Sequence, residues 1–264
     1  MIKKLIFILF FGVLSSHSQS TSSDLIASSP FQEGEWFQLR IHYGLLNASY
    51  ATLSLDRDTI NGNPVFHAKA FGETSGIARW FVKVEDYYES YFDQTTILPY
   101  KFIRDINEGG YTKSIEIDFN HELKKAKVNN KKKKVITEFE IQPNVQDLIS
   151  CFYYLRNFYP NEDIGINESF DINMFFDQEN YVFKLKYLGK EVIKSKFGDI
   201  NCLKFRPVVQ SGRVFKEQES VTLWVSDDKN KLPIRLQADI LVGSIKADIE
   251  NFRNLKYPFK ININ

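Results

Sequence analysis

Two adjacent acidic pairs are the first residues of this sequence that could do chemistry. Two carboxylates held about 5–10 Å apart can share the acid and base roles of glycoside cleavage, and the chain offers Glu85-Asp86 and Asp227-Asp228. Neighbouring residues of a strand point to opposite faces, so Glu85 and Asp86 cannot form such a pair by themselves. Asp227-Asp228 is typical of a polar turn in which aspartate supports its own backbone. We therefore expect neither pair to be catalytic.

Histidine, the commonest metal ligand, is scarce. Only His42, His67 and His121 follow residue 18, and none has HxxxH or HxH spacing or a Cys or carboxylate at metal-ligand spacing. A nucleophile elbow requires G-x-S-x-G, whereas segment 72–76 has Thr74 at its centre. The sequence thus predicts no metal, no cofactor and no serine nucleophile.

One short segment has the composition of a binding site. Arg79 and Trp80 are adjacent in a predicted loop between strands, and Tyr87 and Tyr88 follow closely. Tryptophan, tyrosine and arginine are the residues enriched at binding hot spots. The same residues would also suit a loop folded back over a β-core, and both interpretations stay open.

The two cysteines, Cys151 and Cys202, suggest a disulfide in an oxidising compartment. Closing the loop between them would stabilise the fold by about 2–4 kcal/mol. The alternative is two separate buried thiols that behave as small apolar side chains. No CxxC is present, so we expect no redox catalysis.

A signal peptide is predicted at residues 1–18. Lys3 and Lys4 precede an apolar run over residues 5–14, and small residues follow at the positions required for a cut before Gln19. No cysteine follows the apolar run, so a lipid anchor is not expected. These features predict a periplasmic or secreted protein with no transmembrane segment in the mature chain. Residues 19–30 are rich in Ser and Thr and are predicted to be a flexible leader.

Charge excludes one class of partner. The chain has 34 basic and 33 acidic side chains, and removing Lys3 and Lys4 with the leader turns the net charge from +1 to −1. This balance gives no electrostatic case for a polyanionic partner, whether nucleic acid or an anionic membrane. Lys131–Lys134 could contact phosphate or lipid headgroups, but we favour a solvated hairpin tip whose charges deter edge association.

The elements that must position these residues are mostly strands. Phe37, Leu39 and Ile41 alternate with polar residues, and Asn61-Gly62 is a two-residue hairpin signal. Leu188-Gly189-Lys190 is predicted to turn the chain. The remaining strands are expected at about residues 51–55, 65–71, 82–92, 100–106, 111–119, 123–128, 135–141, 181–187, 191–194, 200–209, 221–226, 234–241 and 244–252.

One helix interrupts the strands. Asn144 is the predicted N-cap, and Val145, Ile149 and Phe152 recur at helical spacing through Phe158. Pro160 is expected to end the helix. Its apolar stripe is expected to be core, and Arg156 in its last turn suits the helix dipole. The prediction is a mainly β fold, with antiparallel sheets curled into a barrel, half-barrel or sandwich and this helix packed on them, in a single domain over residues 31–264.

Three segments occur in the order found in one family. They are Phe31 to Glu35, Asp147 to Arg156, and Leu223 to Asp227 before Leu232-Pro233. In these segments, and over about residues 31–252, the chain resembles the bacterial family known as domain of unknown function 3108. The resemblance implies an exported, mostly β bacterial protein and supplies no activity, ligand or catalytic residue.

The leading functional hypothesis is a non-enzymatic cell-envelope protein, because the sequence has a leader and an aromatic-rich β-pattern but no recognisable catalytic set. Its partner would be a lipid-like or other apolar ligand, or another envelope component, held by the curled sheet. One alternative is a hydrolase of envelope polysaccharide or peptide that uses carboxylates assembled by the fold. Another is a structural or assembly factor, for which an exposed apolar patch would be the sign.

Overall fold

The computed structural model describes residues 29–158, 164–208 and 221–262. The predicted signal peptide and most of the predicted leader lie outside the described residues. Ser29 and Pro30, the last two residues of that leader, are buried. Ser29 Oγ donates a hydrogen bond to the carbonyl oxygen of Phe31 at 2.9 Å. The packed part of the chain therefore begins by residue 29.

In the part of the chain that the structure describes, fourteen strands form one antiparallel sheet, as the alternating sequence pattern predicts. They are β1 (Trp36–Tyr43), β2 (Leu46–Ile60), β3 (Asn63–Thr74), β4 (Val84–Asp93), β5 (Pro99–Glu108), β6 (Tyr111–Asn120), β7 (Lys125–Asn130), β8 (Val135–Glu140), β9 (Ser169–Phe176), β10 (Glu179–Ser195), β11 (Gly198–Val208), β12 (Val221–Ser226), β13 (Pro233–Asp239) and β14 (Ser244–Arg253).

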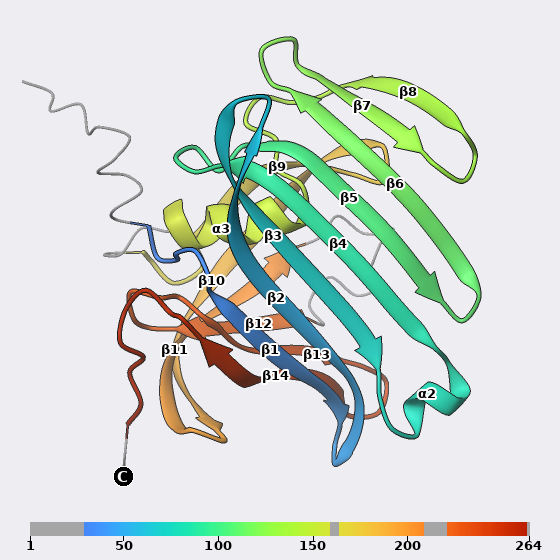
Figure 1. The fold of residues 1–264 in the computed structure, drawn as a ribbon. Helices are drawn as coiled ribbons and strands as arrows, with labels where there is room; N and C mark the ends of the chain where they lie inside the picture. The colour runs from blue at the N-terminus through green and yellow to red at the C-terminus, as the bar shows by residue number, and fades with distance from the viewer. Residues whose placement is uncertain (1–28, 159–163, 209–220, 263–264) are drawn as a thin grey trace, which may run out of the picture.

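The strand order is β8-β7-β6-β5-β4-β3-β2-β1-β14-β13-β12-β11-β10-β9. Every neighbouring pair but one is consecutive in sequence. The exception is β1 with β14, where Trp36 lies opposite Arg253. The sheet is open, with β8 and β9 at its edges, and Figure 1 shows it bent so that β2–β6 lie in front of β9 and β10.

Side chains and one loop bridge the two open edges. Asn180 at the start of β10 donates from Nδ2 to the carbonyl oxygen of Glu140 at 2.7 Å. Arg104 on β5 contacts Asp177 at 2.7 Å. Gln146 forms a parallel bridge with Met174 that covers the edge of β9. Covering an edge in this way prevents it from pairing with another chain.

Two details of the strands differ from the sequence prediction. β9 was not predicted. The chain does not turn at Leu188-Gly189-Lys190, because β10 runs through this segment and absorbs the extra residue as a bulge at Gly189. Gly189 has φ +114, which glycine adopts without the steric cost of a side chain.

Within the described residues, two short helices accompany the sheet: α2 (Ala78–Phe81) and α3 (Leu148–Phe158). Asp147, and not Asn144, caps α3, because its Oδ1 accepts hydrogen bonds from the amides of Ile149 and Ser150 at 2.7 and 2.8 Å. Asn144 is exposed and has a left-handed φ of +54. Pro160, predicted to end the helix, lies outside the described residues.

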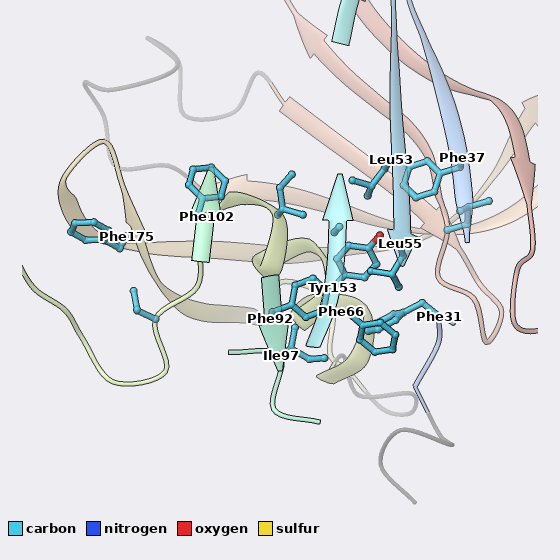
Figure 2. Close-up of a cluster of buried hydrophobic side chains, with 14 of the residues drawn as sticks. Phe31, Phe37, Leu53, Leu55, Phe66, Phe92, Ile97, Phe102, Tyr153 and Phe175 are labelled. Atoms are coloured by element: carbon cyan, nitrogen blue, oxygen red, sulfur yellow. The ribbon is translucent and has the colours of Figure 1, made fainter. Parts of the chain in front are cut away.

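The core lies between the sheet and α3. Tyr153 of α3 is fully buried there, with its ring 4.8 Å from Phe31 and 5.1 Å from Phe92. Phe66 lies 5.6 Å from Phe31 (Figure 2). α3 contacts β3 and β4 on one side and β9 on the other. Aromatic side chains therefore fill this space, and the predicted apolar stripe of the helix is core.

Candidate functional site

A groove of about 650 Å³ indents the surface of the protein. It lies between the tip of the β2–β3 hairpin and strands β4, β5 and β6. Ring, carboxylate, amine and amide groups line it, mixed with few aliphatic side chains. The lining residues are Asp58, Thr59, Ile60, Asn61, Tyr91, Tyr100, Lys101, Asp118 and Phe119. A concave surface with a few converging polar groups is the usual form of a ligand site.

Local sequence explains both walls of the groove. Asn61 and Gly62 have φ of +52 and +82, as a two-residue hairpin turn requires. On the other wall, Tyr91 pairs with Lys101 but the next residue of β4 pairs with Pro99. Tyr100 is therefore the extra residue of a β-bulge, a feature that re-aims a side chain out of the regular alternation. Sequence periodicity does not reveal this bulge.

A histidine lies beneath the groove among acidic groups. His67 Nε2 is 2.7 Å from Glu89 Oε2, and its Nδ1 is 3.8 Å from Asp58 Oδ2. The ring of Tyr91 stacks on that of His67 at 3.8 Å. Burial lowers the pKa of His67, and this outweighs the opposing effect of the hydrogen bond with Glu89. His67 is therefore neutral at pH 7 and acts as a polar support for Tyr91.

Tyr91 itself stays a phenol. Burial, followed by the nearby charge of Glu89, raises its pKa to about 12. Its hydroxyl donates to Glu89 Oε2 at 3.3 Å. A phenol held in this way offers a ring face and a neutral hydroxyl to a ligand, not a nucleophile.

Lys101 crosses the floor of the groove and neutralises part of its negative charge. Its Nζ lies 3.2 Å from Asp118 and 2.7 Å from Glu116. Lys131 also contacts Glu116, at 2.6 Å. These contacts leave Asp118 half exposed with oxygens free to accept further hydrogen bonds. Within the described part of the chain, no group of His, Cys, Asp and Glu has the arrangement of a metal site.

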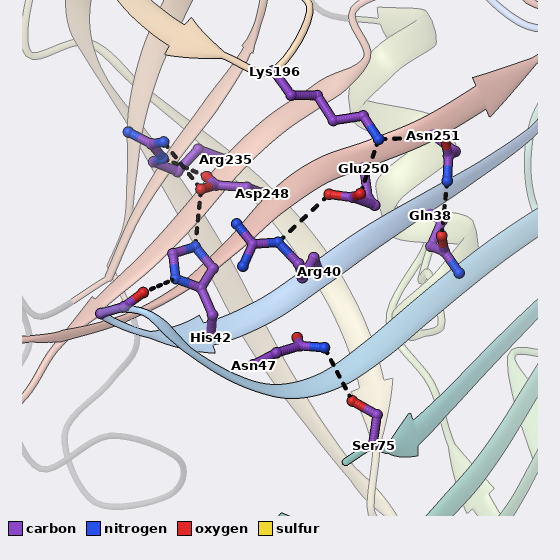
Figure 3. A network of polar contacts seen from close by, with 11 residues as sticks. Gln38, Arg40, His42, Asn47, Ser75, Lys196, Arg235, Asp248, Glu250 and Asn251 are labelled. Atoms are coloured by element: carbon purple, nitrogen blue, oxygen red, sulfur yellow. Dashed lines mark hydrogen bonds and ion pairs between the residues drawn. The ribbon is translucent and has the colours of Figure 1, made fainter. Parts of the chain in front are cut away.

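A second polar cluster, shown in Figure 3, connects β1, β14 and β13. His42 Nε2 lies 3.0 Å from Asp248, and Arg235 also contacts that carboxylate. Burial alone would raise the pKa of Asp248, but the hydrogen bonds from Arg235 and His42 hold it below its usual value. Lys196 contacts Glu250 at 2.9 Å and fastens the β10–β11 turn to β14. The paired charges indicate a structural role.

Arg79 and Trp80 lie in α2, in the connection between β3 and β4 where the sequence predicts a loop. Arg79 forms ion pairs with Glu73 at 3.3 Å and with Glu85 at 2.8 Å. Trp80 is 89% exposed, so this loop does not fold back over the core. Neither residue lies in the groove.

Tyr87 and Tyr88 do not share a surface. Tyr87 is exposed and stacks on Phe71 at 4.5 Å, whereas Tyr88 points to the opposite face and packs near Phe102 in the core. The structure thus keeps Arg79 and Trp80 together and separates Tyr88 from them. This separation follows from strand alternation.

Cys151 and Cys202 are free thiols in the structure, so it contains the separate buried thiols and not the disulfide. Cys151 packs with Ile172 and Met174, whereas Cys202 lies in the main core. Each thiol occupies a different apolar cluster, which explains why they do not pair.

The acidic pairs have structural surroundings. Glu85 contacts Arg79 and Lys83, and Asp86 accepts a hydrogen bond from the amide of Asn107 at 3.2 Å. Asp228 accepts a hydrogen bond from the amide of Asn230 at 2.9 Å and another from Lys231 at 3.2 Å, as expected for a turn. These contacts account for both pairs without catalysis.

The sequence matches the family described as protein of unknown function DUF3108 over residues 38–250. Among curated proteins, none matches it. A β-barrel-like protein of domain of unknown function DUF1849 from Brucella abortus is structurally similar, with a TM-score of 0.52 and 7% identity. The match covers 85% of this chain and 98% of that one.

A more distant structure is that of a DUF1089 family protein from Pseudomonas aeruginosa, with a TM-score of 0.39 and 10% identity over 71% of this chain and 88% of that one. At these identities the first similarity describes the fold alone, and it agrees with the predicted β-barrel-like class.

Proposed function

The chain belongs to the DUF3108 family, whose function is unknown, so we infer its role from its own groove. We propose that it is an exported, non-enzymatic protein of the bacterial cell envelope that binds an oligosaccharide in this groove. The observation that carries the proposal is the pairing of two tyrosines, Tyr91 and Tyr100, with the carboxylates of Asp58 and Asp118.

This lining matches the chemistry of a sugar. A sugar ring has apolar C–H faces that pack on aromatic rings and hydroxyl groups around its rim that donate hydrogen bonds. Tyr91 and Tyr100 supply the rings, and tyrosine combines an apolar body with a polar end. Asp58 and Asp118 supply acceptors, and Asn61 supplies both a donor and an acceptor. An apolar ligand would leave these polar groups without partners, which costs free energy.

Binding is favoured over cleavage. Asp58 and Asp118 come from different walls, which is the arrangement that would suit a glycoside hydrolase. Each is about half exposed, however, and Asp118 is in an ion pair with Lys101. A general acid requires a carboxyl that keeps its proton in a less polar setting. The proposal therefore assigns these groups to hydrogen bonding.

Export is supported by the apolar run over residues 5–14 behind Lys3 and Lys4. Within the described residues, no helix combines the length and apolar character needed to cross a bilayer. The predicted leader is what supports delivery outside the cytoplasm.

The test is calorimetric titration of the purified protein with soluble N-acetylglucosamine oligomers. We expect saturable binding, and we expect Tyr100→Ala to weaken it at least tenfold because the bulge presents this ring to the groove. Tyr111→Ala removes an exposed tyrosine at the opposite end of the strands and is the matched control. Absence of binding by these oligomers and by acidic oligosaccharides, or equal binding by both variants, would overturn the proposal. Shortening of the oligomers during titration would instead support the hydrolase.

A further inference from the structure

The antiparallel order gathers several turns at the end of the sheet opposite the groove. Because each strand reverses direction, the β1–β2, β3–β4, β5–β6, β7–β8 and β13–β14 connections all lie at this end. We call this surface the tip row, defined by residues 43–46, 75–83, 108–111, 130–135 and 240–243. In Figure 1 the turn between β1 and β2, α2 and the turn between β5 and β6 follow one another along the lower right of the molecule.

The tip row exposes large apolar side chains where turns normally carry polar ones. The exposed fraction is 101% for Leu45, 89% for Trp80 and 102% for Leu241. Nine further apolar residues of the row are exposed: Tyr43, Leu46, Ile77, Phe81, Val82, Tyr111, Val135, Ile240 and Val242. Folding gains no burial from these side chains. Apolar surface of this extent on a folded protein marks an interaction site.

Hydrogen bonds join the turns into one surface. Tyr43 donates from its hydroxyl to the carbonyl oxygen of Val242 at 2.9 Å, which connects the β1–β2 and β13–β14 turns. The amide of Ser75 donates to Ala48 at 2.9 Å and connects the α2 loop to β2. The amide of Gly109 donates to Lys83 at 2.8 Å and connects that loop to the β5–β6 turn. The apolar tips are therefore held side by side.

Unneutralised positive charge lies at one end of the row. Lys131 is paired with Glu116, but among the described residues no ion pair joins Lys132, Lys133 or Lys134 to a carboxylate. Protruding tryptophan and leucine at the same end of the sheet as these lysines form the combination that binds an anionic lipid surface.

We propose that the tip row docks this protein on the surface of an anionic lipid bilayer. Leu45, Trp80, Phe81 and Leu241 enter the interfacial zone, and Lys132–Lys134 face the headgroups. We assign lipid as the occupant because the apolar side chains protrude individually from separate turns. A fluid bilayer can surround each of them separately. The groove lies at the other end of ten-residue strands, roughly 33 Å away, and stays open to solvent. The inference does not depend on the ligand of the groove.

The experiment is vesicle sedimentation with the processed protein, recovered after export with its N-terminus verified so that residues 5–14 contribute nothing. Vesicles contain either phosphatidylcholine alone or equal parts of phosphatidylcholine and phosphatidylglycerol. We expect binding to the anionic vesicles and at least tenfold weaker binding by Trp80→Ser with Leu241→Ser. Lys132→Gln, Lys133→Gln and Lys134→Gln combined should remove the preference for anionic vesicles.

Leu123→Ser is the matched control, since Leu123 is exposed at the end of the sheet that carries the groove. It should leave vesicle binding unchanged. The affected side chains are exposed, so all variants are expected to keep the wild-type circular dichroism. Failure to bind either vesicle, equal loss in Leu123→Ser, or self-association through Trp80 in place of lipid binding would each overturn the proposal.

Discussion

Glu35 and Arg156 form a fully buried, two-bonded ion pair that connects the start of β1 to the last turn of α3. Nη1 and Nη2 of Arg156 lie 2.6 and 2.9 Å from the two carboxylate oxygens. Nη2 also donates to the carbonyl oxygen of Asn230 at 2.8 Å, so the β12–β13 turn joins the same contact. An interaction with the helix dipole therefore describes only part of the role of Arg156. Its side chain also connects α3 to the start of β1 and to the β12–β13 turn.

Removing one member of this pair should destabilise the protein strongly. Glu35→Gln leaves a buried guanidinium without its counter-charge, which costs about 3–5 kcal/mol. Urea unfolding followed by circular dichroism measures the loss. Glu33→Gln is the control, because Glu33 is exposed and its contact with Arg57 is 3.7 Å long; it should change stability by less than about 1 kcal/mol. Similar unfolding midpoints for the two variants would contradict this account.

Asp147 should make stability fall as pH rises from about 4 to about 6. Burial raises its pKa to about 6 in the folded protein, against the hydrogen bonds from Ser90 and the helix amides. The unfolded chain loses this proton at lower pH, near 3.9. The raised pKa therefore contributes stability below about pH 4 that is lost as pH rises through about 6.

Asp147→Asn isolates this effect, because asparagine is also a good N-cap. We expect the wild type to lose about 3 kcal/mol relative to the variant between pH 4 and pH 7. Parallel urea titrations of the two proteins at both pH values measure the difference, and all other groups cancel. A stability difference that is the same at pH 4 and pH 7 would show that Asp147 is not the titrating group.

Both thiols should be inert in the folded protein. Burial raises the pKa of Cys151 well above its usual range and that of Cys202 to about 12. Since the thiolate is the reactive form, Ellman's reagent should label neither cysteine under native conditions and both in urea. Mass spectrometry of the native protein should find two free thiols. Rapid labelling of either cysteine without denaturant, or a disulfide-linked peptide, would show that the thiols are not buried as described.

Gly198 should tolerate alanine less well than Gly62. Both have left-handed backbone, with φ of +128 and +82. A Cβ at Gly198 would lie 2.8 Å from Cγ2 of Ile261, whereas nothing lies within 4 Å at Gly62. Gly62→Ala should therefore cost about 1–2 kcal/mol of backbone strain. Gly198→Ala should cost about 1–3 kcal/mol more because it displaces the C-terminal segment. Thermal unfolding of the two variants checks the order.

The fold could be predicted in large part because its strands are amphipathic and its turns have strong signals. Phe37 and Leu39 show the two-residue period, and Asn61-Gly62 marks a hairpin. β9 was not predicted because its residues, Ser169–Phe176, show a less regular alternation of apolar and polar side chains. The predicted N-cap was wrong by three residues, because asparagine and aspartate are equally good N-cap residues. The structure adds a contact that the local sequence does not contain: Ser90 of β4 donates a hydrogen bond to the Asp147 carboxylate.

The groove could not be predicted, because no local pattern contains it. Its walls come from β2, β4, β5 and β6, and the position of Tyr100 depends on a bulge. His67 was considered only as a metal ligand, since its neighbours Glu89 and Tyr91 are 22 and 24 positions away in the chain. The tip residues were visible as Trp80 and Lys131–Lys134, but only strand direction shows that they share an end with Leu241.

The pairing of Trp36 with Arg253 imposes a delay on the newly made chain. β2 can join β1 at once, but the other side of β1 waits for β14, about 200 residues later. At synthesis rates of about 5–20 residues per second, this wait lasts roughly 10–40 s. An unpaired strand edge is a template for association with other chains. The emerging protein must therefore be shielded along β1, and closure of this one seam marks the moment when shielding can end.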